Sequence, residues 1–209
     1  MSNDFGIIGI FPIPVYITER ESKLDSTEKK EIEDIVKGEM RKNPENSYSQ
    51  NSHIFNTKLK KIKEFCEKHI QTYVKEAINP REELDVYITQ SWLNVTKPGE
   101  SHHQHYHPNS IISGVFYIAT EETDGIWFYG QPKVSEKIKI TEKESNSYNS
   151  SQFFVDIKNH VLLLFPSSLA HGVEPNNKTT TDRISISFNT FTRGIFGDLK
   201  NGLNELILK

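Results

Sequence analysis

The first eighty residues contain two segments in which apolar positions recur at the spacing of a helix. In the first, Asp25 and Glu28 have the spacing of a capping box, and apolar residues follow at helical intervals as far as Met40. The second starts at Lys58 and stops at the Asn79-Pro80 pair. The pattern predicts two amphipathic helices as a support between about residues 20 and 80.

Two other stretches of this region lack that spacing. Residues 11–17 are apolar but include two prolines, which cannot donate to a β-ladder, so an edge strand or an extended lead-in is expected. Residues 42–57 are rich in Asn and Ser and contain a proline, which is typical of a loop. We expect this loop to lie where it could cover a site.

After Pro80 the period changes from that of a helix to the alternation of strands. Short runs rich in Val, Ile, Tyr, Phe and Trp predict strands near 84–95, 111–119, 125–129, 136–141, 152–157, 160–166 and 183–191. The Asn- and Ser-rich residues 141–151 predict a loop. Strands in this number after a helical pair indicate a mainly β fold, a sandwich or jelly roll packed against two helices. We expect one domain over residues 1–209, with its β core at about 84–191.

Composition narrows the class of protein. With 35% hydrophobic and 11% aromatic residues the chain resembles an ordinary globular protein, and its net charge of -3 gives no basic footprint for general nucleic-acid binding. The single cysteine, Cys66, falls in a helical pattern and indicates a buried thiol in a reducing compartment. Neither a secretory signal nor a membrane-spanning run is evident, so we expect a cytoplasmic protein.

Four of the eight histidines lie between residues 102 and 107. If His105 and His107 occupy an extended strand, their side chains point to the same face, because residues i and i+2 share a side. Two imidazoles so placed can bind one metal ion. Taken alone, the motif favours a solvated or nucleic-acid-facing histidine-rich loop over a metal site, because short motifs often match by chance.

Two later segments add to this pattern. His171 follows the buried strand Val161–Phe165 through a turn, where it is either a hydrogen-bonded core residue or a third ligand. Arg183 and Ser185 then share one face of a strand whose other face is apolar. A guanidinium fork and a hydroxyl on one face can hold a carboxylate, although an arginine here could also form a surface ion pair.

Several stretches together resemble the 2-oxoglutarate/Fe(II) oxygenase superfamily, in its prolyl-hydroxylase-like branch. Within that branch, the chain most resembles a group of small oxygenases from marine bacteria and tailed phages. It rests on Phe11-Pro-Ile-Pro-Val-Tyr16, Ser91-Trp-Leu-Asn94, His105-Tyr-His-Pro-Asn-Ser110, Ser113-Gly-Val-Phe-Tyr117, Gly125-Ile-Trp-Phe128, Phe165-Pro-Ser-Ser-Leu-Ala-His171 and Arg183-Ile-Ser-Ile-Ser-Phe-Asn189.

The resemblance implies a double-stranded β-helix that uses Fe(II), 2-oxoglutarate as cosubstrate, and O2. By position, His105 and His171 match the two metal histidines of the superfamily, and Arg183 with Ser185 matches its clamp for the 2-oxoglutarate carboxylate. Further candidates for hydrogen bonds to the cosubstrate or the ligands are Asn94, Ser113 and Tyr117, whereas His102 and His103 are expected outside the metal site or in solvent.

The departure from the family pattern is His107, which stands where the superfamily has Asp or Glu and would complete a site of three histidines. Halogenase relatives have a small residue there, so hydroxylation is expected instead. The substrate stays open among peptidyl, nucleobase and small-molecule targets, and so does the oligomeric state.

Two other classes of function compete with this hypothesis. One is a cupin-type three-histidine dioxygenase, since Gly99-x5-His105-x-His107 copies the start of the first cupin motif, although the cupin glutamate is missing. Arg183 and Ser185 favour 2-oxoglutarate, because a cupin acting on a small thiol or diketone needs no carboxylate clamp. The other is a non-catalytic β-sandwich with a binding or structural role.

Overall fold

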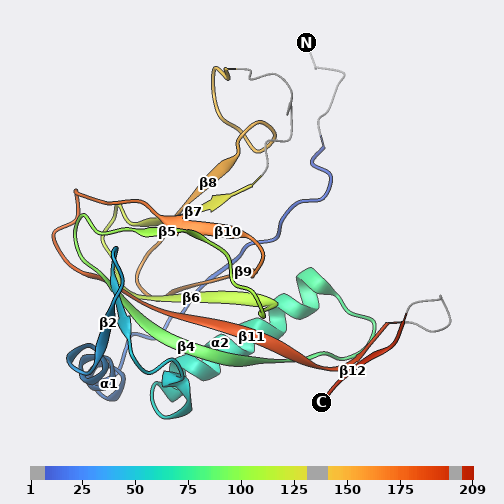
Figure 1. The fold of residues 1–209 in the computed structure, drawn as a ribbon, viewed down its shortest axis with the longest axis horizontal. Coiled ribbons are helices and arrows are strands. Elements are labelled where there is room, and N and C mark those ends of the chain that lie inside the picture. Colours follow the sequence, from blue (N-terminus) through green and yellow to red (C-terminus); the bar gives the residue numbers. More distant parts are fainter. Residues whose placement is uncertain (1–7, 131–140, 198–203) are drawn as a thin grey trace.

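A computed structural model describes residues 8–130, 141–197 and 204–209 of the chain. Its strands form two antiparallel sheets that face each other, and two helices cover the outer face of the larger sheet (Figure 1). This is the mainly β jelly roll with two helices that the alternation of strands predicts.

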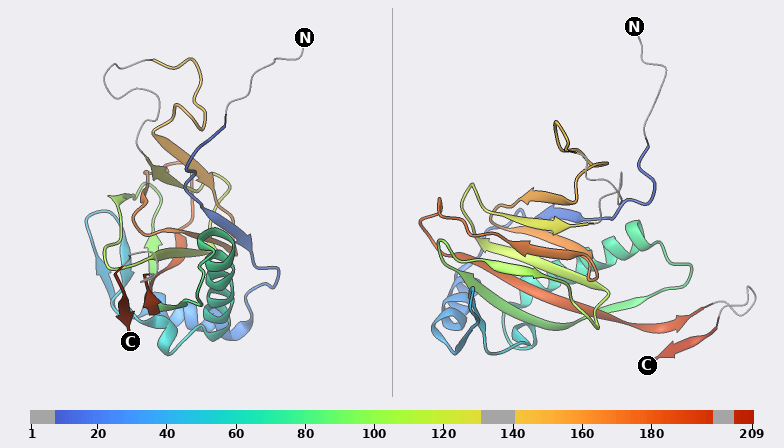
Figure 2. Two further views of the ribbon diagram at one scale, coloured as in Figure 1. Left: turned by 90° about the vertical axis from the view of Figure 1, so that its right-hand side faces the viewer. Right: turned by 45° about the horizontal axis from the view of Figure 1, so that its top comes forward.

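The larger sheet runs in the order β1-β9-β6-β11-β4-β3-β2, with β12 paired to β11. Its strands are β1 (Tyr16–Glu19), β2 (Met40–Lys42), β3 (Ser47–Ser49), β4 (Asp85–Thr96), β6 (Ile112–Ala119), β9 (Val161–Pro166), β11 (Arg183–Phe196) and β12 (Leu206–Leu208). The smaller sheet runs β5-β10-β7-β8, from β5 (His102–His105), β7 (Gly125–Tyr129), β8 (Gln152–Asp156) and β10 (Ala170–Val173). Figure 2 shows how the smaller sheet lies above the larger one.

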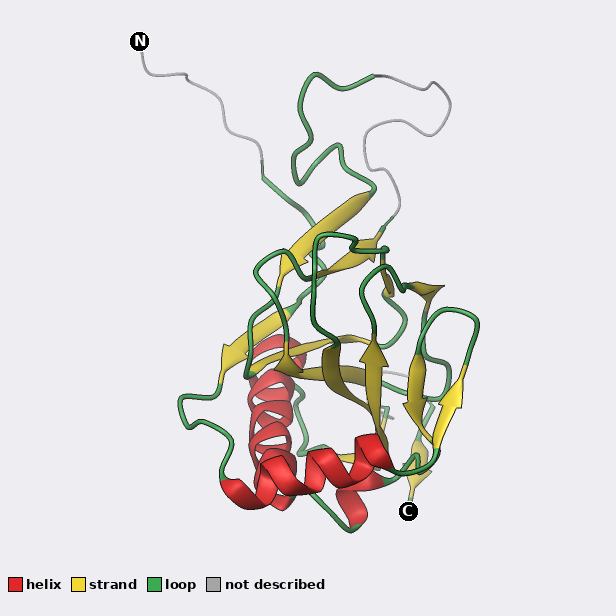
Figure 3. Cartoon of the chain, turned by 90° about the vertical axis from the view of Figure 1, so that its left-hand side faces the viewer, coloured by secondary structure: helices red, strands yellow, loops and turns green. Residues whose placement is uncertain are grey.

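Both predicted helices are present (Figure 3). Helix α1 (Ser26–Lys37) begins with the capping box of Asp25 and Glu28, in which each side chain accepts a hydrogen bond from the other residue's backbone. Helix α2 (Lys60–Tyr73) continues into a single π-turn, Val74–Ile78, and the chain leaves it at Asn79 in a left-handed conformation. Among the described residues, none of the helices combines the length and apolar character that a membrane span requires.

Two apolar cores flank the larger sheet. The outer core packs the apolar faces of α1 and α2 against the sheet and includes Cys66, which is fully buried as expected. The inner core fills part of the space between the sheets and is formed by Val115, Tyr117, Ile126, Phe128, Ile157, Val161, Leu163, Phe165 and Leu169. The inner core holds the two sheets apart, and the outer core attaches the helices to the larger sheet, so a site between the sheets rests on a fixed support.

The structure differs from the predicted elements in residues 42–57, in the length of β11, and in the short strands β5, β10 and β12, which are absent from the predicted strands. Residues 42–57 are not a plain loop, because β2 and β3 form a hairpin and Ile54–Asn56 form a turn of 3-10 helix. Short strands escape period-2 analysis because they offer too few alternations, and their pairing with β4 stabilises them. Strand β11 extends beyond residue 191 to Phe196 and pairs there with β12. The predicted strand 136–141 lies almost wholly outside the described residues.

Candidate functional site

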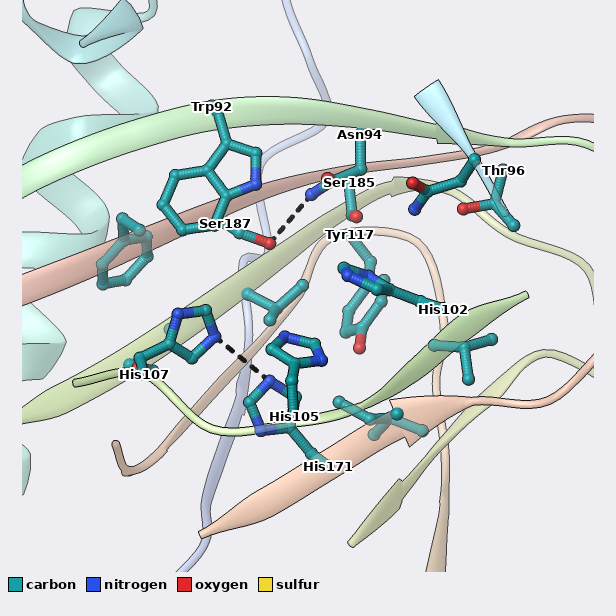
Figure 4. Close-up of a pocket in the computed structure, with 18 of the residues that line it drawn as sticks. Trp92, Asn94, Thr96, His102, His105, His107, Tyr117, His171, Ser185 and Ser187 are labelled. Atoms are coloured by element: carbon teal, nitrogen blue, oxygen red, sulfur yellow. Dashed lines mark hydrogen bonds between the residues drawn. The ribbon is translucent and has the colours of Figure 1, made fainter. Parts of the chain in front are cut away.

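A pocket lies between the two sheets, and polar side chains from both of them line it (Figure 4). The larger sheet contributes alternate residues of two paired strands: Trp92, Asn94 and Thr96 of β4, and Arg183, Ser185 and Ser187 of β11. The smaller sheet and the segment after β5 contribute His102, His105, His107 and His171. Figure 4 shows the three histidines His105, His107 and His171 gathered opposite the side chains of β4 and β11.

The three predicted metal ligands come together. His105 of β5 is directly opposite His171 of β10 in the strand register, so their side chains are neighbours. His107 lies two residues beyond the end of β5, where its backbone N–H donates to the carbonyl of Ser167 at 2.9 Å. One nitrogen from each of the three rings lies within 4.8 Å of the others, which makes the group able to hold a metal ion.

Backbone carbonyls fix which ring nitrogen is available on two of these histidines. The Nδ1 of His105 is 2.7 Å from the carbonyl oxygen of His103, and the Nδ1 of His171 is 2.9 Å from that of Leu169. A carbonyl oxygen only accepts, so in both rings Nδ1 carries the proton and Nε2 presents a lone pair. The Nε2 of His107 lies 3.3 Å from that of His171, so both nitrogens face one point. This arrangement fits a divalent metal ion.

Burial keeps these imidazoles neutral. It lowers the pKa of His171 to about 3 and that of His107 to about 4, and it also lowers the pKa of His105. An imidazole binds a metal only in its neutral form. At neutral pH the three rings are therefore ready to act as ligands without losing a proton first.

Arg183 is buried, with 8% of its surface exposed, which excludes the solvent-exposed ion pair considered above. One terminal nitrogen, Nη1, donates to the carbonyl of Gly125 on β7 at 3.1 Å, so the side chain reaches from the larger sheet to the smaller one. Its Nε is buried and has no hydrogen-bond partner. An unpaired buried guanidinium N–H is costly, so the site favours a ligand that accepts from it.

The other predicted polar residues take different parts in the pocket. Ser185, Asn94 and Tyr117 lie in one cross-strand row and all three line the pocket. The side chain of Asn94 donates to the hydroxyl of Ser187 at 2.9 Å, and burial raises the pKa of Tyr117 to about 12 and keeps its phenol protonated. Ser113 also lines the pocket, but its hydroxyl is bonded to Ser167 and Asn189 and holds neighbouring strands together.

Among the described residues that line the pocket there is no carboxylate. Glu121 accepts four hydrogen bonds from Thr180 and Thr181, while Asp124 accepts one from the backbone of Glu121 in a turn. Asp156 is exposed on β8. None of these three acids is placed to complete a metal site, and the donor set is three neutral nitrogens.

Of the two remaining histidines of the cluster, only His102 lines the pocket, and the pocket also includes Trp92, Thr96 and Asn46, which the sequence did not single out. The ring of His102 stacks on that of His105 with centroids 4.4 Å apart, whereas His103 is exposed and lies 2.9 Å from a carboxylate oxygen of Glu45. Trp92 and Thr96 share the face of Asn94, so the alternation of β4 could have identified them. Asn46 carried no such signal, because it belongs to the segment that was predicted to be a loop.

Comparison with known families gives one match within the chain. Residues 90–189, a little under half of the sequence, match the model of the family described as "Putative 2OG-Fe(II) oxygenase". The matched segment runs from β4 to β11 and includes every histidine of the metal group as well as Arg183 and Ser185. No curated protein matches the chain.

Solved structures share the fold. A prolyl-4-hydroxylase from Pseudomonas putida is 12% identical with a TM-score of 0.55, and the match covers 87% of this chain and 94% of that one. HygX from Streptomyces hygroscopicus, solved with nickel, 2-oxoglutarate and hygromycin B bound, is 11% identical with a TM-score of 0.54, and the match covers 85% and 82%. The likeness confirms the double-stranded β-helix.

Proposed function

We propose that this protein is an Fe(II)- and 2-oxoglutarate-dependent dioxygenase that hydroxylates a C–H bond of its substrate. The observation that carries the proposal is the pairing of two features in one pocket. Three neutral imidazoles converge on one point, and a buried arginine opposite them has an N–H without a partner. A cupin-type dioxygenase explains the first feature but gives no use for the second.

The proposal assigns the metal ligands to the Nε2 atoms of His105, His107 and His171. Arg183 binds the distal carboxylate of 2-oxoglutarate, with Ser185 as a second donor from the same face of β11. Asn94 and Tyr117 lie in the same cross-strand row as Ser185 and hydrogen-bond the bound cosubstrate. The iron supplies activation of O2 coupled to decarboxylation of 2-oxoglutarate to succinate.

The chain itself positions the reactants and limits the access of water. Phe165 and Val115 line the pocket beside the polar groups and belong to the inner core, so the floor of the site is apolar. His107 fills the position that a halide would need, which favours hydroxylation over halogenation. The single cysteine, Cys66, is a buried free thiol, which supports a reducing, cytoplasmic location for the protein.

An anaerobic titration tests the proposal directly. Addition of 2-oxoglutarate to the Fe(II)-loaded protein is expected to produce a weak visible charge-transfer band, because the keto acid then chelates the metal. Admission of O2 is expected to release succinate slowly without any added substrate. Absence of both the band and succinate, in a protein that binds Fe(II), would contradict the proposed function.

The replacement His107→Asp tests the unusual ligand. Exchanging a neutral imidazole for a carboxylate lowers the charge of the site by one unit, so Fe(II) is expected to bind more tightly and uncoupled succinate release to be kept or raised. Fe(II) affinity is measured for the wild type, His107→Asp and His107→Ala. If all three bind Fe(II) equally, His107 is not a ligand.

A further inference from the structure

Asn46 lies in the hairpin between β2 and β3, and its side chain lines the same pocket as Arg183. Only 3% of the residue is exposed. Ser47 is opposite Val95 in the register of β3 with β4, and the antiparallel pairing therefore continues with Asn46 beside Thr96. Thr96 in turn is opposite Arg183. The three pocket residues form one row across neighbouring strands, with Arg183 at its end.

Asn43 fixes the orientation of the Asn46 amide. The Oδ1 of Asn43 accepts hydrogen bonds from the backbone N–H groups of Glu45 and Asn46, both at 2.8 Å. The Nδ2 of Asn43 therefore faces Asn46 and donates to its Oδ1 at 2.6 Å. With its oxygen engaged in this way, the amide of Asn46 turns its NH2 group away from Asn43.

That NH2 group is buried and has no partner. Two unpaired donors thus line one pocket, the Nδ2 of Asn46 and the Nε of Arg183, and no carboxylate among the described lining residues can accept from either. A buried donor without a partner costs roughly 1–3 kcal/mol, so it is expected to be satisfied when the pocket is filled. The pair is suited to two acceptor oxygens on an anion.

We propose that Asn46 is a further donor to the distal carboxylate of 2-oxoglutarate, in addition to Arg183 and Ser185. The inference rests on the proposed function and adds the β2–β3 hairpin, which precedes the segment matched by the family model, to the cosubstrate site. In this arrangement the guanidinium supplies the charge. The amide of Asn46, held by Asn43 in the turn between β2 and β3, supplies a directed hydrogen bond.

The affinities of two ligands distinguish a role of Asn46 in binding the distal carboxylate from a role in holding the fold. The dissociation constants of 2-oxoglutarate and of 2-oxobutyrate, which lacks the distal carboxylate, are measured by calorimetry on the nickel-loaded protein. In Asn46→Ala the affinity for 2-oxoglutarate is expected to fall about 10- to 100-fold, the value of a hydrogen bond to a charged group, while that for 2-oxobutyrate stays unchanged. Asn51→Ala, an exposed residue just after the same hairpin, is the matched control and should bind both ligands as the wild type does.

A second variant tests the orientation of the amide. In Asn43→Asp the Oδ1 that holds the turn is kept, but the donor to Asn46 becomes an acceptor, so the amide of Asn46 is expected to rotate and present its oxygen to the pocket. The same selective loss of 2-oxoglutarate affinity should follow. If circular dichroism shows that Asn46→Ala does not fold, Asn43→Asp tests the proposal by itself.

The possible outcomes separate this inference from the proposed function. Unchanged 2-oxoglutarate affinity in Asn46→Ala, or an equal loss of affinity for both ligands, would overturn the role of Asn46. A wild-type protein that does not prefer 2-oxoglutarate over 2-oxobutyrate would instead contradict the proposed function itself.

Discussion

Replacement of His171 by alanine is expected to abolish metal binding. His171 is the most buried of the three histidines, and its Nε2 faces the same point as those of its neighbours. Loss of an outer partner of a metal ligand typically costs about 10- to 100-fold in affinity, and loss of a ligand itself should exceed the upper value. The measurement is the Fe(II) dissociation constant of His171→Ala under anaerobic conditions.

His103→Ala is the matched control. His103 belongs to the same cluster, but its side chain is exposed and paired with Glu45, and its backbone carbonyl, which orients His105, is kept in the variant. Its Fe(II) affinity should equal that of the wild type. Because the ring of His171 packs at 4.6 Å between centroids against Phe165, thermal unfolding of both variants shows whether the fold survives. Full Fe(II) affinity in a folded His171→Ala would remove His171 from the metal site.

Replacement of Arg183 by alanine is expected to weaken 2-oxoglutarate binding by about a hundredfold or more and to leave Fe(II) affinity nearly unchanged. The expectation follows from the burial of the guanidinium and its unpaired Nε, since a charge-assisted hydrogen bond in a closed pocket is stronger than a neutral one. The dissociation constants of metal and cosubstrate are measured separately.

Two further variants make the test specific. Arg183→Lys keeps the charge but loses the planar fork, so an intermediate loss of affinity is expected. Arg193→Ala removes an exposed arginine of the same strand, which pairs with Asp85 at the surface, and should have no effect on either ligand. Wild-type 2-oxoglutarate affinity in Arg183→Ala would show that another residue holds the carboxylate.

The fold class could be predicted because its signals are periodic and local. Helical spacing from Asp25 onwards and after Lys58 predicts α1 and α2, and alternation predicts β4, β6, β7, β8, β9 and β11 to within a few residues over most of their length. The strands absent from the predicted list, β2, β3, β5, β10 and β12, have three or four residues each. Segments of that length contain too little pattern to identify, and they form because longer neighbouring strands offer backbone partners.

The identity of the candidate ligands was also contained in the sequence. The i, i+2 spacing of His105 and His107 and the polar face that begins at Arg183 are patterns of residues close together in the chain, although His107 lies beyond the end of β5 and not on the strand that the spacing predicts. That these residues lie close together in space could not be read from the sequence. The register of β5 with β10 brings His105 opposite His171, although 66 residues separate them in the chain, and a one-residue slip would turn one of the two rings out of the pocket.

The tertiary structure alone decided the protonation state of the histidines and the full set of residues that line the pocket. Burial between the sheets keeps the imidazoles neutral, and the carbonyls of His103 and Leu169 select the nitrogen that each ring presents. Asn46 lines the pocket because its hairpin pairs with β4, and no local sequence pattern predicts that contact. The sequence by itself thus determined which candidate groups the protein has for a metal site and a carboxylate site. Only the packing of strands distant in the chain decided that these groups share one water-restricted pocket, because burial, register and hydrogen-bond partners depend on residues that are far apart in sequence.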